Sequence, residues 1–98
     1  MFAVTTMRGP AWDAGRGIRE QRAWAEHADF ADMLVEDGWV LLGGPIDDPD
    51  ERVTALLAMD VPSASAVHEL FGEDPWVRLG ILAIKDVRPW TIWLRPRS

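Results

Sequence analysis

The chain has 98 residues, 48% of them hydrophobic and 27% charged, with a formal net charge of −6. This length and composition predict one globular domain over residues 1–98. Cysteine is absent and histidine occurs twice, which excludes disulfide scaffolds and thiol catalysis and disfavours a metal site. The acidic charge also disfavours nucleic acid as a partner, because phosphate backbones are recognised by basic surfaces.

No apolar run reaches the roughly 20 residues that span a bilayer, so we expect no membrane partner. The segment Met1–Met7 lacks a basic stretch followed by a long apolar one, which is the pattern of a secretory signal. We therefore expect a cytoplasmic protein.

The first third of the chain predicts a strand, a loop and a helix. Phe2–Met7 is rich in β-branched residues and predicts the strand, and the glycine-rich segment Arg8–Gly17 predicts the loop. The glycine spacing of this loop is not that of a phosphate-binding loop. Ile18–Asp37 predicts a helix that ends at Gly38. One face of that helix carries residues at spacings of three and four: Trp24, His27, Ala28, Ala31, Leu34 and Val35.

The middle of the chain predicts a β-hairpin. Trp39–Leu42 is a strand that we expect to end at Gly43-Gly44-Pro45, and Val53–Met59 is the strand that returns. The connection Ile46–Glu51 is acidic, but it lacks the spacing of an EF-hand. We interpret it as a solvated loop rather than a calcium site.

The last third predicts a helix, a turn and a strand. Ser63–Gly72 is the second helix, which a serine can cap, and Asp74–Gly80 is a turn. Ile81–Leu94 is a long strand broken near Pro89, and residues 95–98 form a loose tail.

The element order βαββαβ is typical of the ferredoxin-like α+β fold, an antiparallel sheet with two helices on one face. The strands Trp39–Leu42 and Val53–Met59 are nearly continuous apolar runs. A sheet whose second face meets water alternates apolar and polar residues, and two short helices cover one face only. We therefore expect a second copy of the chain on the other face, in a homodimer packed sheet to sheet.

Two side chains are candidates for acid–base chemistry. His27 lies in the middle of the first helix, on its apolar face, where it can act as a general base or be a half-buried structural histidine. Asp74 follows the second helix in a rigid Asp-Pro turn, where it can orient the imidazole or simply bond backbone amides. His68 lies beside the apolar face of its helix, and we expect it to be exposed.

Other residues leave alternatives open. Arg8, Arg16, Arg19 and Arg22 can bind an anionic substrate, although solvated surface charge is the default for such residues. Trp12, on the glycine-rich segment, is either held against a neighbouring side chain or part of a mobile lid.

An ordered set of motifs carries a family resemblance. The set begins with His-Ala-Asp-Phe-Ala at His27 and Gly43-Gly44-Pro45, continues with Asp-Pro-Trp-Val-Arg-Leu-Gly at Asp74, and ends with Val87-Arg-Pro-Trp90. From about Trp24 to Trp90, the chain resembles the YciI-like (YCII-related) family. The resemblance implies a ferredoxin-like domain that dimerises as an α/β barrel, as in muconolactone isomerases. It also implies a His–Asp active site, which falls on His27 and Asp74, and one branch of the family resembles dehydrochlorinases of chlorinated hydroxyquinols.

The leading functional hypothesis is a small-molecule isomerase or lyase without a cofactor or a bound metal, in which His27 moves a proton and Asp74 orients it. One alternative is a non-catalytic domain for small-molecule binding or dimerisation. Another is a monooxygenase of the dimeric-barrel type, with tryptophans lining its pocket. We expect an unidentified small molecule as the ligand, besides the second copy of the chain.

Overall fold

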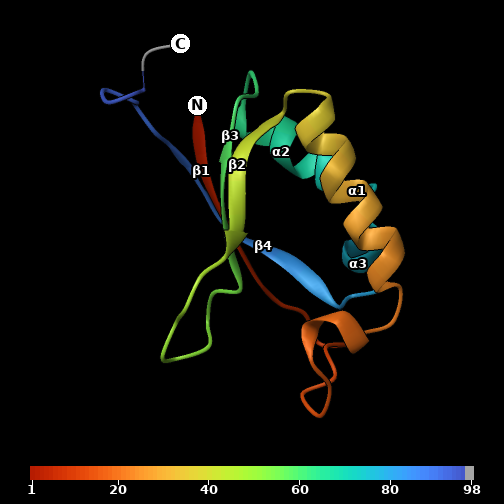
Figure 1. Cartoon of the computed structure of the whole chain (residues 1–98). Helices are drawn as coiled ribbons and strands as arrows, with labels where there is room; N and C mark the ends of the chain where they lie inside the picture. The colour runs from red at the N-terminus through yellow and green to blue at the C-terminus, as the bar shows by residue number, and fades with distance from the viewer. Residues whose placement is uncertain (97–98) are drawn as a thin grey trace.

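The computed structural model describes residues 1–96 and has a ferredoxin-like α+β fold, as predicted. Its four strands form one antiparallel sheet in the order β2-β3-β1-β4, and the helices lie on one side of this sheet (Figure 1). The elements in chain order are β1 (Phe2–Arg8), the 3₁₀ turn η1 (Ile18–Glu20), α1 (Trp24–Glu36), β2 (Val40–Pro45), β3 (Ala55–Met59), α2 (Ala64–Phe71), α3 (Pro75–Arg78) and β4 (Leu82–Pro89).

Apolar side chains fill the space between the sheet and the helices in two clusters. The larger cluster lies under α1 and α2 and includes Val4 of β1, Leu34 of α1 and Val67 of α2, each at most 2% exposed. The smaller cluster centres on Trp76 of α3, with Ile81 and Leu82 beside it. Because the second cluster lies at the first turn of α1, it joins the start of that helix to α3 and β4.

The prediction of one helix over Ile18–Asp37 was wrong at its beginning. The structure has the short turn η1, then an extended residue, Gln21, and α1 begins only at Trp24. The buried Gln21 side chain donates to the carbonyl oxygens of Asp13 and Arg16, at 2.7 and 3.1 Å. Its amide thereby anchors the preceding loop, a role that apolar periodicity does not reveal.

The predicted strand ends were also wrong in part. β2 continues through Gly43 to Pro45, because β2 is an edge strand and tolerates a residue without an N–H. A side chain at Gly43 would collide with Leu57 of β3, so glycine allows the two strands to pair here. β3 begins at Ala55, two residues later than predicted.

The last strand is shorter than the predicted Ile81–Leu94. β4 ends at Pro89, and the N–H of Trp90 makes one further bond, to the carbonyl oxygen of Met1. Its neighbour β1 begins at Phe2, so the residues that follow have no strand to pair with. Of the predicted loose tail, 95–98, the first two residues are exposed and in no helix or strand; the last two lie outside the described residues.

Several local predictions are confirmed. The side chain of Ser63 accepts a hydrogen bond from the N–H of Ala66 at 3.2 Å and caps α2. Gly38 follows α1 with a φ of +82°, a conformation that suits glycine at the end of a helix. The predicted turn Asp74–Gly80 contains the one-turn helix α3.

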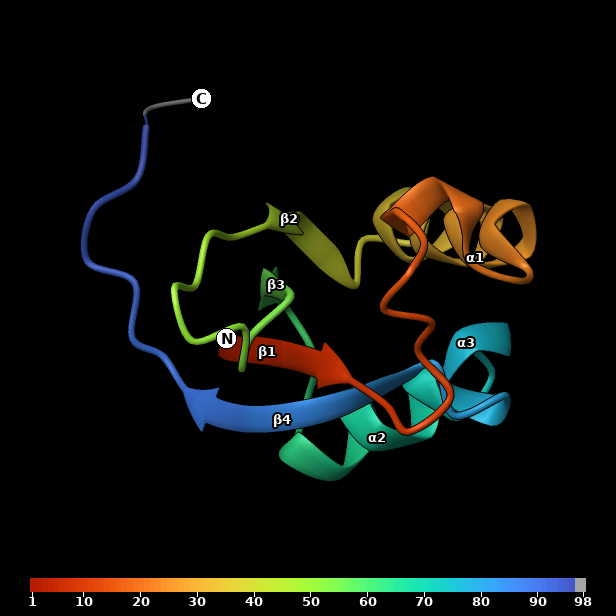
Figure 2. The ribbon, with the colours of Figure 1, turned by 90° about the horizontal axis from the view of Figure 1, so that it is seen from below.

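The second face of the sheet carries no helix of the described chain (Figure 2). Leu42, whose side chain is on this face, is 69% exposed, and Met7 is also exposed. The segment after β4 extends away from the helices (Figures 1 and 2) and leaves Trp93 and Leu94 exposed. Among residues 1–96, no helix is both long enough and apolar enough to cross a membrane.

Candidate functional site

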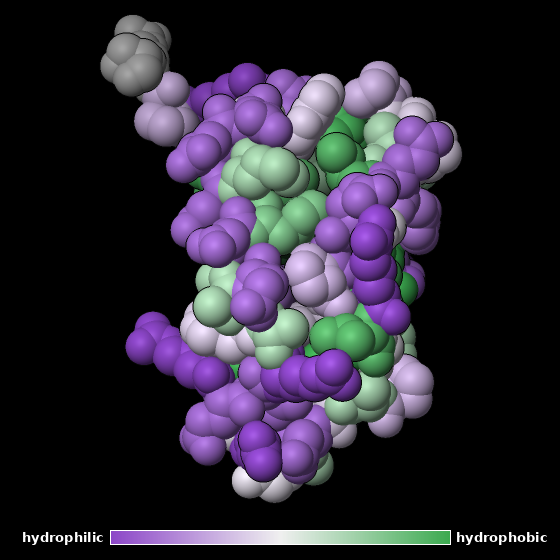
Figure 3. Space-filling view, turned by 90° about the vertical axis from the view of Figure 1, so that its right-hand side faces the viewer, coloured by the Kyte–Doolittle hydropathy of each residue, from purple (hydrophilic) through white to green (hydrophobic). Residues whose placement is uncertain are grey.

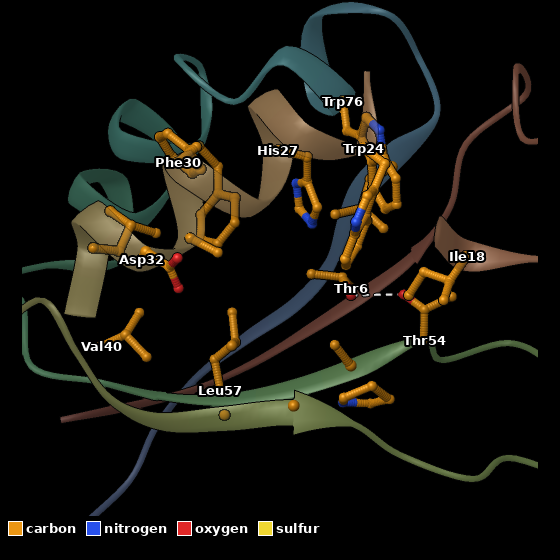
Figure 4. A pocket seen from close by; sticks show the side chains of 18 of the residues that line it. Thr6, Ile18, Trp24, His27, Phe30, Asp32, Val40, Thr54, Leu57 and Trp76 are labelled. Atoms are coloured by element: carbon orange, nitrogen blue, oxygen red, sulfur yellow. Dashed lines mark hydrogen bonds between the residues drawn. The ribbon is translucent and has the colours of Figure 1, made fainter. Parts of the chain in front are cut away.

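A cavity of about 300 Å³ lies between α1 and the sheet, next to the smaller apolar cluster. This volume matches the lower end of the range for small-molecule pockets. Figure 4 shows His27 pointing from α1 into the cavity, with Trp24 and Trp76 beside it and β1, β2 and β3 opposite. Aromatic side chains form much of the wall: Trp12, Trp24, Phe30, Phe71 and Trp76.

His27 of α1 and Asp74 are in direct contact, although 47 residues separate them in the sequence. The Nδ1 atom of His27 lies 3.0 and 2.9 Å from the two carboxylate oxygens of Asp74. The Asp74 side chain is completely buried, and that of His27 is 16% exposed. The pair therefore stands at the boundary between the core and the cavity.

Local structure holds Asp74 in place before any contact with His27. Asp74 is the N-cap residue of α3, and its Oδ1 accepts a hydrogen bond from the N–H of Trp76 at 2.9 Å. Pro75 occupies the first position of the helix, where its missing N–H costs nothing. The carboxylate thus has one local partner and one distant partner.

Trp76 fixes the plane of the imidazole. Its ring stacks on the ring of His27, with a centroid distance of 3.9 Å and an interplanar angle of 3°. Its Nε1 donates to the carbonyl oxygen of Arg22 at 2.7 Å, which ties α3 to the segment before α1. Trp24 packs against both rings at tilted angles.

This geometry assigns the two ring nitrogens of His27 different tasks. An ionised carboxylate only accepts hydrogen bonds, so Nδ1 carries the proton that Asp74 accepts. In the neutral imidazole, Nε2 then holds a free lone pair. The arrangement can accept a proton from a molecule in the cavity, and Asp74 can stabilise the imidazolium that forms.

A model of the YCII-related domain matches residues 9–91. The chain belongs to the YCII-related family. No curated protein matches this YCII-related chain.

Among solved structures, the chain is similar to 5-chloro-2-hydroxyhydroquinone dehydrochlorinase from Burkholderia phenoliruptrix, in complex with 2,5-dihydroxybenzoquinone. The TM-score is 0.59 at 20% identity, and the match covers 93% of this chain and 94% of that one. At this identity the likeness supports the ferredoxin-like fold of the YCII-related chain.

Of the other residues considered from the sequence, Trp12 lines the cavity, whereas His68 and the arginines are not part of the lining. His68 is exposed on α2, as expected. No arginine lines the cavity among the described residues. Trp12 is held against a neighbour: its ring packs edge-on against Trp76 at 5.8 Å, and the Arg8 guanidinium lies 5.0 Å from its centroid.

The surface on the helix side of the molecule shows hydrophilic side chains around apolar patches (Figure 3).

The acidic loop between β2 and β3 is built around one carboxylate. The Asp48 side chain accepts hydrogen bonds from the N–H groups of Asp50, Arg52 and Val53, at 3.1, 2.8 and 2.9 Å. These bonds hold the pKa of Asp48 below its ordinary value, and the bond from the N–H of Asp50 has the largest effect. Within residues 1–96, no group of three or more acidic, histidine or cysteine side chains is placed to hold a metal ion.

The cavity also has two polar residues that were not predicted from the sequence, Thr6 of β1 and Thr54, which precedes β3. Their hydroxyl oxygens are 2.7 Å apart and share a hydrogen bond. One signal was available for Thr6, because the period of two along a strand places it on the same face as the core residue Val4. Thr54 carries no such signal, since it lies in a loop before the strand begins.

Proposed function

We propose that this YCII-related protein is a cytoplasmic lyase or isomerase that acts on a small organic molecule without a cofactor, with dehydrochlorination as the leading reaction. One observation carries the proposal: buried Asp74 holds His27 through Nδ1, while the imidazole faces an aromatic cavity. A positioned base beside an aromatic-walled cavity is what proton-transfer chemistry on a small molecule requires. The dehydrochlorinase among similar structures supports the choice of reaction.

In the proposed elimination, a hydroxyl proton of the substrate moves to the chlorine-bearing ring carbon, which gives a keto tautomer with a saturated carbon–chlorine centre. Nε2 of His27 then takes the proton of a second ring hydroxyl, and the electrons of that O–H bond form the second carbonyl. The adjacent ring double bond shifts to the chlorinated carbon, and chloride leaves with the electrons of the carbon–chlorine bond. The net change is the loss of HCl, so no oxidant or reductant takes part. Asp74 orients the imidazole and stabilises its charged form. The stacked ring of Trp76 holds the imidazole in the orientation in which Nδ1 contacts the carboxylate.

The test is chloride release from a panel of chlorinated hydroquinones and hydroxyhydroquinones, measured by ion chromatography. We expect turnover by the wild-type protein and a loss of at least about 100-fold in His27→Asn, because general-base catalysis contributes this much or more. His68→Asn is the matched control, since His68 is exposed on α2 and is not part of the cavity lining. Melting curves of both variants show whether the fold is intact.

Unchanged chloride release in a folded His27→Asn variant would contradict the assignment of the base. Binding of the panel compounds without any product would contradict the lyase and favour the non-catalytic binding domain instead. The aromatic wall would suit such a domain equally well.

We also propose that two copies of the chain associate through the open face of the sheet. Leu42 on this face and Trp93 in the segment after β4 are 69% and 87% exposed, which is unusual for large apolar side chains. Burial of this face against its own copy would remove both from water and protect the sheet from other partners.

Light scattering at micromolar concentration tests the association. We expect a mass of twice the 11.0 kDa of one chain, and a shift to the single-chain mass in Leu42→Glu, because a charge would then be buried in the interface. Met33→Glu is the control, since Met33 is also an exposed apolar residue but lies on α1. A wild-type mass of a single chain would contradict the proposal.

A further inference from the structure

The cavity contains a second polar group opposite His27, and no step of the proposed reaction uses it. Thr6 and Thr54 line the cavity from the sheet side, whereas His27 reaches it from α1 (Figure 4). Thr6 is only 2% exposed. The backbone supports the arrangement, because the N–H of Thr54 donates to the carbonyl oxygen of Thr6 at 2.9 Å.

The two hydroxyls have more hydrogen-bonding capacity than they use. Each hydroxyl has one proton and two lone pairs, and a hydroxyl pair shares one proton between its oxygens. The 2.7 Å bond between Thr6 and Thr54 therefore leaves one O–H without an acceptor, and among residues 1–96 neither hydroxyl makes another side-chain hydrogen bond. Buried polar groups in proteins are normally satisfied, so an O–H left over at a cavity wall is a binding group for a ligand.

The charges around the cavity restrict what the ligand can be. Its described lining contains no lysine or arginine, and its one carboxylate, Asp32, is exposed at the helix side. An anionic ligand would find no cation to offset its desolvation, and the net charge of −6 would repel it. The aromatic walls favour a planar ring.

We infer that the Thr6–Thr54 hydroxyl pair binds an oxygen of the substrate, and that the substrate is an uncharged ring carrying a hydroxyl or carbonyl group. The inference rests on the proposed function for the role of His27. It adds a positioning site: with one oxygen held at the sheet, the opposite edge of the ring lies toward the imidazole on α1. The two threonines are thus specificity-determining residues, and they act on binding as well as on turnover.

The register of the sheet is consistent with such a role. The pairing of β1 with β4 shifts between Thr5 and Thr6, where β4 has one extra residue, Lys85. Such irregularities of a strand pairing are common next to binding sites. Thr5 lies on the opposite face of the sheet and provides a natural control for its neighbour.

The experiment measures the binding of hydroquinone, toluene and benzoate by the quenching of tryptophan fluorescence, which is suited to a cavity with tryptophan walls. We expect the wild-type protein to prefer hydroquinone over toluene and to bind benzoate weakest. Thr6→Val and Thr54→Val are close in shape to threonine and remove the hydroxyl. Either change alone still leaves one free O–H at the cavity wall, so the double variant carries the test. It should weaken hydroquinone binding about tenfold and leave toluene binding unchanged, because it removes both hydroxyls.

Each single variant should lose less than the double variant, and Thr5→Val should bind all three probes like the wild type. His27→Asn should keep the preference for hydroquinone while chloride release is lost, so a failure of the proposed reaction remains distinct from a failure of this site. The inference is overturned if the wild type does not prefer hydroquinone, or if the double variant weakens toluene and hydroquinone binding equally.

Discussion

Two aspartates illustrate how the same side chain serves a local and a distant purpose. Asp48, in the loop between β2 and β3, accepts hydrogen bonds from three N–H groups, all within five residues of it. Asp74 accepts one such bond, from Trp76, and its remaining capacity meets His27 on another helix. The comparison teaches that a buried carboxylate that does not use all its lone pairs on nearby N–H groups can bond a side chain of a distant element, and so help to form a site.

The two regions share a second feature, a residue other than glycine in the left-handed conformation. Ala23, just before α1, has a φ of 59°, and Glu51, in the acidic loop, has a φ of 56°. Such residues carry a conformational cost of about 1 kcal/mol. At Ala23 this conformation follows the anchoring of Gln21 and precedes the helix that carries His27. Backbone strain is therefore present both at Ala23, beside the candidate site, and at Glu51, in the acidic loop.

The largest expected effect comes from replacing the two aspartates in parallel. Asp74→Ala removes the cap of α3 and leaves the buried Nδ1 of His27 without a partner, so we expect a loss of about 2–4 kcal/mol in the free energy of unfolding. Asp48→Ala should cost clearly less, because its partners face solvent and can bond water. Urea unfolding, followed by circular dichroism, measures both.

Asp74→Asn separates the two tasks of this residue. The amide oxygen can still cap α3, whereas the negative charge beside His27 is lost. We expect most of the stability to return while chloride release stays low. Equal stability losses in Asp74→Ala and Asp48→Ala would contradict the distinction between the two aspartates.

Replacing a residue in the left-handed conformation by glycine should have an effect of intermediate size, and it should raise the stability rather than lower it. Ala23→Gly should raise the free energy of unfolding by about 0.5–1 kcal/mol, because glycine adopts this conformation without the clash of a Cβ atom. Glu51→Gly should gain less, since it also removes the surface ion pair with Arg8. Ala25→Gly, inside α1, is the control and should be destabilising. A loss of stability in Ala23→Gly would contradict the assignment of strain.

The smallest expected effect is a pH dependence of the stability that Asp48 contributes. Its pKa is lowered in the folded state, so its contribution to stability is present above the ordinary value of 3.8 and is lost as the pH falls through the folded-state pKa. We expect Asp48→Asn to melt slightly below the wild type at neutral pH and to match it in strong acid. A difference that stays constant across this range would show that the carboxylate charge plays no part in the loop.

The sequence by itself determined the elements whose signals are local. The serine cap of α2 and the glycine after α1 are confirmed, because each depends on a few neighbouring residues. The order of strands and helices follows from hydrophobic periodicity, and with it the ferredoxin-like fold. The resemblance to the YCII-related family pointed to His27 and Asp74, which the structure brings into contact.

Tertiary structure alone decided the features that depend on distant partners. β4 ends at Pro89 because β1 offers no further pairing partner, and α1 begins late because Gln21 anchors a loop. The stacking of Trp76 on His27 and the hydroxyl pair of Thr6 and Thr54 join residues about 50 positions apart. No local pattern encodes such contacts, because they form only when the sheet and the helices pack together.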